Sequence, residues 1–338
     1  MKTILLTGIT GFIAKRIAVD LLNAGYYVRG SMRSTKRVQE VNAAIAPHLD
    51  DANKLTKLSF CELDLTKDNG WSDAVRGVDA VIHTASPFPG DTPKDENDLI
   101  RPAVDGATRA LKAAQAAGVK RVVLTSSMVA IMHKDVADGQ VLTPQDWSTV
   151  GHKTMGAYAK SKTLAEKAAW DFVAAHPEIE LTTINPGLVV GTPTDGNYGT
   201  SLELIAQFMN GKFPMVPNFG LPIVDIADVS AAHVNALSKP GSIGKRFILA
   251  DSYMMAPEMI DVLRSKYADR KLPKRRAPKF VVKLMSLFDA QAKTLLPIID
   301  LNLSLDNTAT TDVLDVTFTP TADALLAAAD AIVKYENA

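Results

Sequence analysis

The stretch KTILLTGITGFIAK, residues 2–15, decides the fold of this chain. A run of leucine and β-branched residues leads into Gly8, a spacer pair and Gly11. An apolar spacing of three and four residues then begins at Phe12. This order predicts a strand, a tight turn and a helix.

The two glycines and Ala14 suit this turn to a bound group. Gly8 can adopt a backbone conformation closed to other residues, Gly11 lets the main chain approach a ligand closely, and Ala14 lets the helix lie against the strand. Because the free N–H groups and the positive end of the helix face the turn, the ligand expected there is a pyrophosphate. The alternative is a strand-to-helix turn that binds nothing.

The composition is ordinary for a globular protein. Of 338 residues, 47% are hydrophobic and 22% are charged, and 37 Lys and Arg residues balance 37 Asp and Glu residues. With no charge excess, nucleic acid and anionic membranes are not expected partners. The single cysteine, Cys61, excludes an internal disulfide and indicates a reducing compartment. No unbroken apolar stretch of about 18 residues is present, so we expect a cytoplasmic protein.

Strands and helices alternate beyond the opening unit. We expect strands at 26–32, 58–63, 80–84, 121–125 and 181–185, and helices at 35–45, 96–117 and 157–175. This rhythm predicts the α/β class, with a doubly wound parallel sheet of the Rossmann type. Ligands of such sheets bind at the carboxyl ends of the strands.

The alternation loosens after residue 188. Residues 1–188 and 223–249 are expected to form the nucleotide-binding domain, because the second segment has the pattern of a return to the main sheet. Residues 189–222 and 250–338 are expected to form a smaller C-terminal substrate lobe. Within these segments, Asp225 is expected to cap the helix that follows it.

A basic loop follows the second strand. About twenty residues beyond the glycine turn, where a carboxylate would hold the ribose hydroxyls of NAD, the chain has Arg33, Ser34, Lys36 and Arg37. Guanidinium and ammonium groups form charge-assisted hydrogen bonds with phosphate. We therefore expect NADP(H), whose 2′-phosphate this loop would bind. A solvated basic loop is the alternative.

The ends of the third and fourth strands carry further candidates. Asp64, followed by Leu65, offers an acceptor for the adenine amino group, with a turn or cap role as the alternative. The small residues from Thr84 to Ser86 would let the middle of the cofactor pass close to the chain. His83 beside them is expected to be a core histidine.

The fifth strand and a later helix carry the candidate chemistry. The strand leads to Ser126 and Ser127, and the helix places Tyr158 and Lys162 four residues apart on one face. A free tyrosine has a pKa of about 10, and a fixed positive charge favours its phenolate. Lys162 is therefore expected to lower the pKa of Tyr158.

These motifs, in this order, resemble the extended short-chain dehydrogenase/reductases. Within them, the chain is similar to the branch of dihydroflavonol and cinnamoyl-CoA reductases, which includes NADPH-dependent aldehyde and methylglyoxal reductases. The resembling pieces are TGITGFIA (7–14), VIHTASPF (81–88), RVVLTSS (121–127), YAKSKTLAEKAAW (158–170), NPGLVVG (185–191) and VDIADV (224–229). The resemblance runs from residue 3 to about residue 235 and is faint after residue 250.

The resemblance implies roles for the candidate residues. Ser127 would hydrogen-bond the substrate carbonyl oxygen, with Ser126 as the alternative if the register differs by one. Tyr158 would donate a proton to that oxygen, and Lys162 would hold the nicotinamide ribose. Together with the arguments above, the cofactor-binding residues are expected to be Thr7, Gly8, Gly11, Phe12, Ile13, Arg33, Lys36, Asp64, Leu65, Thr84, Ala85, Ser86, Tyr158, Lys162, Pro186, Gly187 and Val189.

The expected activity is reversible NADPH-dependent reduction of a small-molecule aldehyde or ketone. The substrate-binding residues are expected to be Phe88, Ser127, Met128, Tyr158 and Tyr198, with packing as the alternative for Phe88, Met128 and Tyr198. One alternative activity is that of an epimerase or a 3β-hydroxysteroid-type dehydrogenase, and another reading is an NADP-sensing binding protein. No metal is expected, and both a monomer and a homodimer remain open.

Two further residues have structural expectations. Trp147 is expected to anchor the loop before the helix that carries Tyr158. Asp228, like Asp225, is expected to cap the helix near residue 226.

Overall fold

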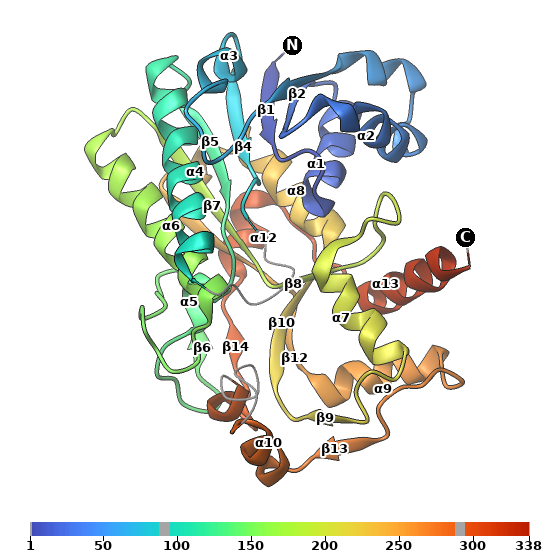
Figure 1. Cartoon of the computed structure of the whole chain (residues 1–338). Helices are drawn as coiled ribbons and strands as arrows, with labels where there is room; N and C mark the ends of the chain where they lie inside the picture. The colour runs from blue at the N-terminus through green and yellow to red at the C-terminus, as the bar shows by residue number, and fades with distance from the viewer. Residues whose placement is uncertain (1, 88–94, 288–294, 338) are drawn as a thin grey trace.

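A seven-stranded sheet forms the centre of the computed structural model, which describes residues 2–87, 95–287 and 295–337 (Figure 1). The strand order is β11-β7-β5-β4-β1-β2-β3, and neighbouring strands run parallel. This confirms the predicted doubly wound α/β class. The strands are β1 (Thr3–Thr7), β2 (Tyr27–Met32), β3 (Leu58–Glu62), β4 (Ala80–His83), β5 (Arg121–Thr125), β7 (Glu180–Pro186) and β11 (Lys245–Leu249).

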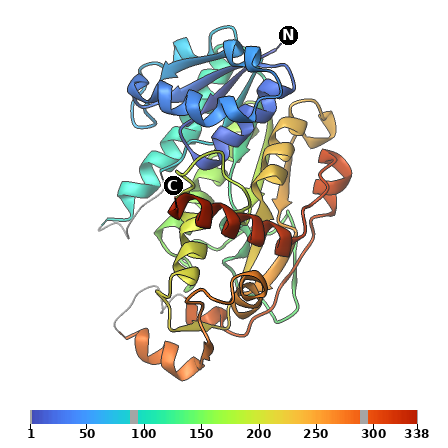
Figure 2. The same cartoon turned by 90° about the vertical axis from the view of Figure 1, so that its right-hand side faces the viewer.

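Helices cover both faces of this sheet (Figures 1 and 2). One face is covered by α1 (Phe12–Asn23), α2 (Val38–Ile45) and α8 (Ile226–Ala236), and the other by α3 (Trp71–Val75), α4 (Asn97–Ala116) and α6 (Ala157–Ala175). Side chains of a strand alternate between the two faces. In β1, Ile4 and Leu6 accordingly pack into the first core, whereas Leu5 packs into the second.

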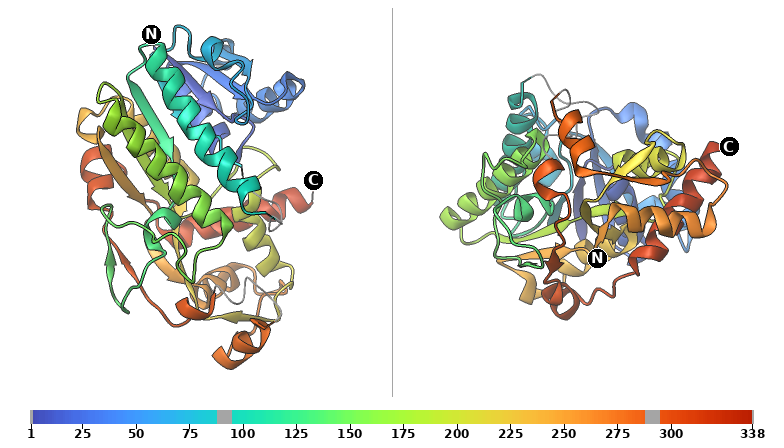
Figure 3. Two further views of the ribbon diagram at one scale, coloured as in Figure 1. Left: turned by 60° about the vertical axis from the view of Figure 1, so that its left-hand side comes forward. Right: turned by 90° about the horizontal axis from the view of Figure 1, so that it is seen from below.

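The two long helices α4 and α6 lie side by side (Figure 3, left). Small side chains on both helices belong to the same buried core, among them Ala103 and Ala107 on α4 and Ala165 and Ala169 on α6. Alanines at this contact let the helices approach closely. The packing fixes α6, which carries Tyr158 and Lys162, against the sheet.

A second, smaller sheet lies beyond the carboxyl ends of the main strands (Figure 1). It contains β8 (Leu188–Val190), β10 (Gly220–Asp225) and β12 (Ser252–Met255). Three helices share a separate apolar core with it: α7 (Gly199–Met209), α9 (Ala256–Lys266) and α13 (Thr321–Glu336). Figure 2 shows α13 crossing this part of the molecule.

Short elements complete the described chain. They are η1 (Thr35–Arg37), η2 (Ala46–His48), η3 (Ala52–Lys57), α5 (Val129–Met132), β6 (Val141–Leu142), β9 (Met215–Pro217), η4 (Pro240–Ser242), β13 (Arg275–Ala277), α10 (Lys279–Met285), η5 (Leu296–Ile298), β14 (Ser304–Leu305) and α12 (Thr308–Leu314). β9 pairs with β13, and β6 pairs with β14. Among the described helices, none is both long enough and apolar enough to span a bilayer.

The expected return to the main sheet is correct in part. β11 joins the edge of the main sheet and α8 packs on α1, but β10 pairs with β8 and β12 instead. A short buried apolar strand fits either sheet, so its pattern does not determine its partner. Leu314 and Val316 also pack into a core of the main sheet. The division into two domains stays a prediction.

Gly187 lies where the two sheets meet. Its N–H donates to the Leu249 carbonyl at 3.0 Å, and a Cβ on it would lie 2.3 Å from the backbone oxygen of Pro222. We expect Gly187→Ala to lower the free energy of unfolding by about 3 kcal/mol, because β7 and β10 would have to separate. Urea denaturation measures this change.

Gly156→Ala is the matched control. Gly156 precedes α6 with φ −84°, and a Cβ there would meet open space. We expect wild-type stability for this variant. Equal stability of the two variants would contradict the packing argument.

Candidate active site

The glycine turn between β1 and α1 has the predicted form. Gly8 has a φ of 70°, in the left-handed region that favours glycine, and the Gly11 N–H donates to the Gly8 carbonyl at 2.9 Å. A Cβ on Gly8 would lie 3.0 Å from Ala85. The turn therefore brings the β4–α4 loop close to the start of α1.

A cavity of about 740 Å³ runs along the carboxyl edge of the main sheet. It contains most of the predicted cofactor residues and all three predicted catalytic residues. The predicted residues that line it are Gly8, Gly11, Phe12, Ile13, Arg33, Asp64, Leu65, Thr84, Ala85, Ser86, Ser127, Tyr158, Lys162, Pro186, Gly187 and Val189. Segments distant in sequence thus form one site.

Thr7 and Lys36 do not belong to the lining of this cavity. Thr7 is fully buried, and its Oγ1 lies 2.9 Å from His83 Nδ1 and accepts the Ala85 N–H at 3.1 Å. It therefore positions the β4 end from below the cavity rather than facing a ligand. His83 is buried, as expected. Lys36 is exposed on η1.

Arg33 is the cavity-facing member of the basic loop. It is exposed and follows β2, whereas Arg37 binds Glu40 through two hydrogen bonds of 2.8 and 2.5 Å. That hydrogen-bonded pair raises the pKa of Arg37. Arg33 is therefore the guanidinium best placed for a phosphate.

Asp64 has a turn role in addition to its cavity position. Its Oδ1 accepts the Thr66 N–H at 2.9 Å and the Thr66 hydroxyl at 2.7 Å, and these hydrogen bonds lower the pKa of Asp64. The turn alternative is therefore confirmed. The cofactor role stays a prediction.

Ser127, Tyr158 and Lys162 meet at one end of the cavity. Ser127 follows β5, and the other two side chains come from the first turns of α6. A side-chain hydrogen bond joins Tyr158 to Ser127. Lys162 Nζ donates to the Thr125 carbonyl at 3.0 Å.

The expected lowering of the Tyr158 pKa is wrong for this structure. Burial raises the pKa of Tyr158 to about 12, because it penalises the phenolate, and the hydrogen bond from Ser127 opposes this shift only in part. Burial also lowers the pKa of Lys162 to about 8, and the charge of Glu166 opposes that shift. Tyr158 is therefore a neutral phenol at pH values near 7.

The two candidate serines both line the cavity but have different side-chain partners. Ser127 contacts Tyr158, whereas the Ser126 hydroxyl donates to Glu166 Oε2 at 2.5 Å. Sequence reasoning missed Glu166, which is buried at 1% exposure and paired with Arg246. The sequence does contain a signal for Glu166: Tyr158, Lys162 and Glu166 are spaced four residues apart, which places them on one helix face.

Two of the predicted substrate contacts, Met128 and Tyr198, do not line the cavity. Met128 is 1% exposed and packs with Ile131 and Leu142, so the packing alternative holds for it. Tyr198 lies against Tyr335, with 6.5 Å between ring centroids. Phe88 lies outside the described residues.

Of the two expected caps on α8, one is confirmed. Asp225 accepts the Ala227 N–H at 2.7 Å at the start of the helix. Asp228 instead accepts hydrogen bonds from the Thr319 N–H and hydroxyl at 2.8 and 3.1 Å.

A doubly wound sheet with a glycine turn and a Ser–Tyr–Lys group at its carboxyl edge defines an extended short-chain dehydrogenase/reductase. The family model of the NAD-dependent epimerase/dehydratase family matches residues 4–250. The chain belongs to this family.

Sequence relatives and solved structures give the same picture. Cinnamoyl-CoA reductase 1 of Arabidopsis thaliana is 32% identical over 275 residues, which cover 80% of this chain and 77% of the relative. Tetraketide alpha-pyrone reductase 2 of the same plant is 34% identical over 275 residues, with coverages of 79% and 83%. The crystal structure of yeast methylglyoxal/isovaleraldehyde reductase Gre2 complexed with NADPH matches with a TM-score of 0.82 and 27% identity over 99% of both chains.

Buried neutral histidines link stability to pH. Burial lowers the pKa of His83 to about 3 and those of His133 and His233 to about 4. Below a pH of about 6.5, these histidines therefore bind protons in the unfolded chain but stay neutral in the folded chain. The contribution of the neutral histidines to the free energy of unfolding is fully present above that pH. It is lost as the pH falls, by about 1.4 kcal/mol per pH unit for each histidine.

His233→Asn tests this linkage. His233 lies between Thr125 Oγ1 and the Val229 carbonyl, both at 2.7 Å. In urea titrations between about pH 6 and 5, the variant should lose stability less steeply than wild type, by about 1.4 kcal/mol per pH unit. Equal slopes would show that this imidazole is protonated in the folded state.

Proposed function

We propose that this protein is an NADPH-dependent carbonyl reductase, which reduces an aldehyde or ketone to an alcohol and catalyses the reverse oxidation. The observation that carries the proposal is the joint placement of Ser127, Tyr158 and Lys162 in a cavity that also contains Arg33. The ends of β4 and β1 lie between these two regions. The reductase names of the relatives and the NADPH complex of the yeast neighbour support the proposal.

The residues present fit a dinucleotide. Gly8 and Gly11 line the cavity at the start of α1, where the first N–H groups of the helix point out of its end and can donate to a phosphate. Arg33 supplies a fork of donors for a 2′-phosphate. When bound, NADPH supplies the hydride.

Tyr158 and Ser127 would act on the substrate oxygen. The high pKa of Tyr158 keeps its proton in place until the carbonyl oxygen gains negative charge, and the phenol then donates it. The Ser127 hydroxyl adds a second donor to the same oxygen and stabilises the developing charge.

Lys162 would stabilise the phenolate that remains. Of the three N–H groups of Lys162, one donates to the Thr125 carbonyl, and another would donate to a ribose hydroxyl. The positive charge of the ammonium would act on Tyr158. Because the site is buried, an ammonium group acts more strongly on the phenolate than it would in water.

Three further expectations belong to this proposal. Residues 189–222 and 250–338 would form the part that covers the substrate. A cytoplasmic location is supported by Cys61, because a single cysteine cannot form an internal disulfide. A homodimer remains compatible with these features.

Tyr158→Phe should lower kcat/KM for aldehyde reduction by about a hundredfold or more, because the proton donor is lost while the ring remains. Absorbance of NADPH at saturating cofactor with a panel of aldehydes and ketones measures turnover, and fluorescence titration measures cofactor binding. We expect NADPH binding to be unchanged. Wild-type turnover in this variant would exclude Tyr158 as the donor.

Arg33→Ala should raise the KM for NADPH about tenfold and leave the KM for NADH nearly intact, because a charge-assisted contact with the 2′-phosphate is lost. Lys36→Ala is the matched control, since Lys36 carries the same positive charge but lies outside the cavity lining. We expect a smaller effect from it. Unchanged preference for NADPH in Arg33→Ala would remove Arg33 from the phosphate site.

A further inference from the structure

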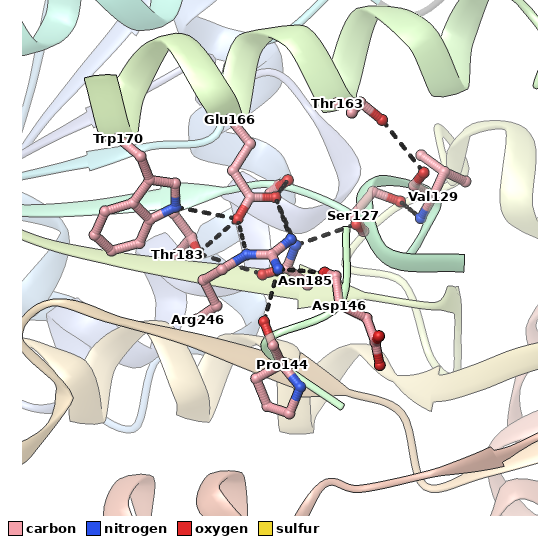
Figure 4. Close-up of polar contacts among 11 residues, drawn as sticks. Ser127, Val129, Pro144, Asp146, Thr163, Glu166, Trp170, Thr183, Asn185 and Arg246 are labelled. Carbon is pink, nitrogen blue, oxygen red and sulfur yellow. Dashed lines mark hydrogen bonds and ion pairs between the residues drawn. The ribbon is translucent and has the colours of Figure 1, made fainter. Parts of the chain in front are cut away.

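Glu166 lies one helical turn after Lys162 and is almost fully buried. Five side chains hydrogen-bond its carboxylate (Figure 4). Oε1 accepts from Arg246, Thr183 and Trp170 at 2.6, 3.0 and 3.3 Å. Oε2 accepts from Ser126, Asn185 and Arg246 at 2.5, 2.8 and 3.3 Å.

Arg246 on β11 gives this carboxylate its partner charge. Its Nε and Nη2 form a fork on both oxygens of Glu166, and its Nη1 donates to the carbonyls of Pro144 and Asp146 at 2.6 and 2.5 Å. Its guanidinium also stacks 3.7 Å from the ring centroid of Trp147. Arg246 therefore joins the carboxylate to the loop before α6, the segment that Trp147 was expected to anchor.

Two routes lead from Glu166 to Ser127. The first is Ser126, the neighbour of Ser127 in the chain, whose hydroxyl is bound to Oε2. The second is Asn185, whose Nδ2 donates to Oε2 and also to the Ser127 carbonyl at 3.2 Å. Both routes end at the residue that contacts Tyr158.

We propose that Glu166 and Arg246 are positioning residues: the carboxylate, held by Arg246, fixes Ser126 and Asn185 and through them holds Ser127 against Tyr158. This inference rests on the carbonyl reductase function proposed above. A buried ion pair by itself is weak evidence for stability. The hydrogen bonds of this pair, however, converge on the backbone of a candidate catalytic residue.

The charge of Glu166 also acts on Lys162. Its negative charge favours the ammonium form. The groups that face this region from other elements are His83 on β4 and His233 on α8, both held neutral by burial, and Arg246 on β11, whose charge opposes that of Glu166. Removal of the carboxylate charge therefore lowers the pKa of Lys162.

Glu166→Gln is the central test, because it keeps the shape of the side chain and removes one acceptor oxygen and the charge. We expect kcat to fall at least about tenfold with little change in the KM for NADPH, since a small displacement of Ser127 is costly in the reaction step but not in cofactor binding. The alkaline limb of the kcat profile should move to lower pH. Asp228→Asn, which removes a buried carboxylate bound to Thr319, should leave kcat and this profile unchanged.

The double variant Glu166→Gln with Arg246→Met separates positioning from stability. It removes both charges, so urea denaturation should show stability recovered relative to Glu166→Gln, while kcat stays low. Arg246→Lys keeps the positive charge but loses the two parallel hydrogen bonds to Glu166 and the hydrogen bonds to the carbonyls of Pro144 and Asp146. It should also lower kcat. Recovery of kcat together with stability in the double variant, or wild-type kcat in Glu166→Gln, would overturn the proposal.

A measurement without turnover separates this inference from the proposed function. The N–H groups of Ser126 and Met128 donate to the carbonyls of Ile184 and Pro186 at 2.7 and 2.9 Å. Their amide hydrogen exchange should be faster in Glu166→Gln than in Asp228→Asn at matched global stability. Lack of wild-type turnover with every carbonyl would contradict the proposed function, whereas unchanged exchange at these amides would contradict the positioning role of Glu166.

Discussion

The burial of Lys162 and the partial burial of Tyr158 are the constraint on which this site depends. Burial raises the pKa of Tyr158 and lowers that of Lys162, so it disfavours charge on both groups. A phenol under these conditions keeps its proton until an oxyanion forms beside it. The same low dielectric strengthens the stabilisation of a phenolate by an ammonium group at the right position. An ammonium group at another position does not stabilise the phenolate. The chemistry therefore requires that the surrounding backbone be fixed.

Two buried arginines fix that backbone at opposite ends of the central strands. Arg121 begins β5, and its guanidinium donates to the carbonyls of Glu180 and Ala236 and to the hydroxyls of Thr182 and Ser242, at distances of 2.6 to 3.2 Å. Burial lowers its pKa to about 10. Arg246 connects β11 to α6 and to the loop before α6, through Glu166 and the carbonyls of Pro144 and Asp146.

The features that the sequence predicts correctly are local. The glycine turn and the Tyr158–Lys162 pair each depend on residues a few positions apart, and backbone geometry alone places such residues together. Thr7 belongs to the same short motif, yet its side chain turns to His83, because a strand alternates its faces. The pairing of Glu166 with Arg246 spans 80 positions, and no local period reports it. The partner of β10 was missed for the same reason.

The segment that leads into α7 is bound to α1 and to η2. Lys15, one turn into that helix and 1% exposed, forms an ion pair with Asp195, and His48 Nε2 lies 3.0 Å from the Thr194 carbonyl. The chain from Asp195 continues into Gly199, which lines the cavity. Beyond this attachment, α7, α9 and α13 have an apolar core of their own. Phe12, which begins α1 and lines the cavity, packs against that core.

The family model and the solved structure match different lengths of this chain. The family model ends at residue 250, shortly after the last strand of the main sheet, whereas the fold of the yeast reductase is matched over 99% of the chain. The main sheet holds charged groups at fixed positions, among them Lys162 through the Thr125 carbonyl and Arg121 through the Glu180 carbonyl. The helices beyond it need only supply apolar faces of the right shape, a requirement that many sequences satisfy.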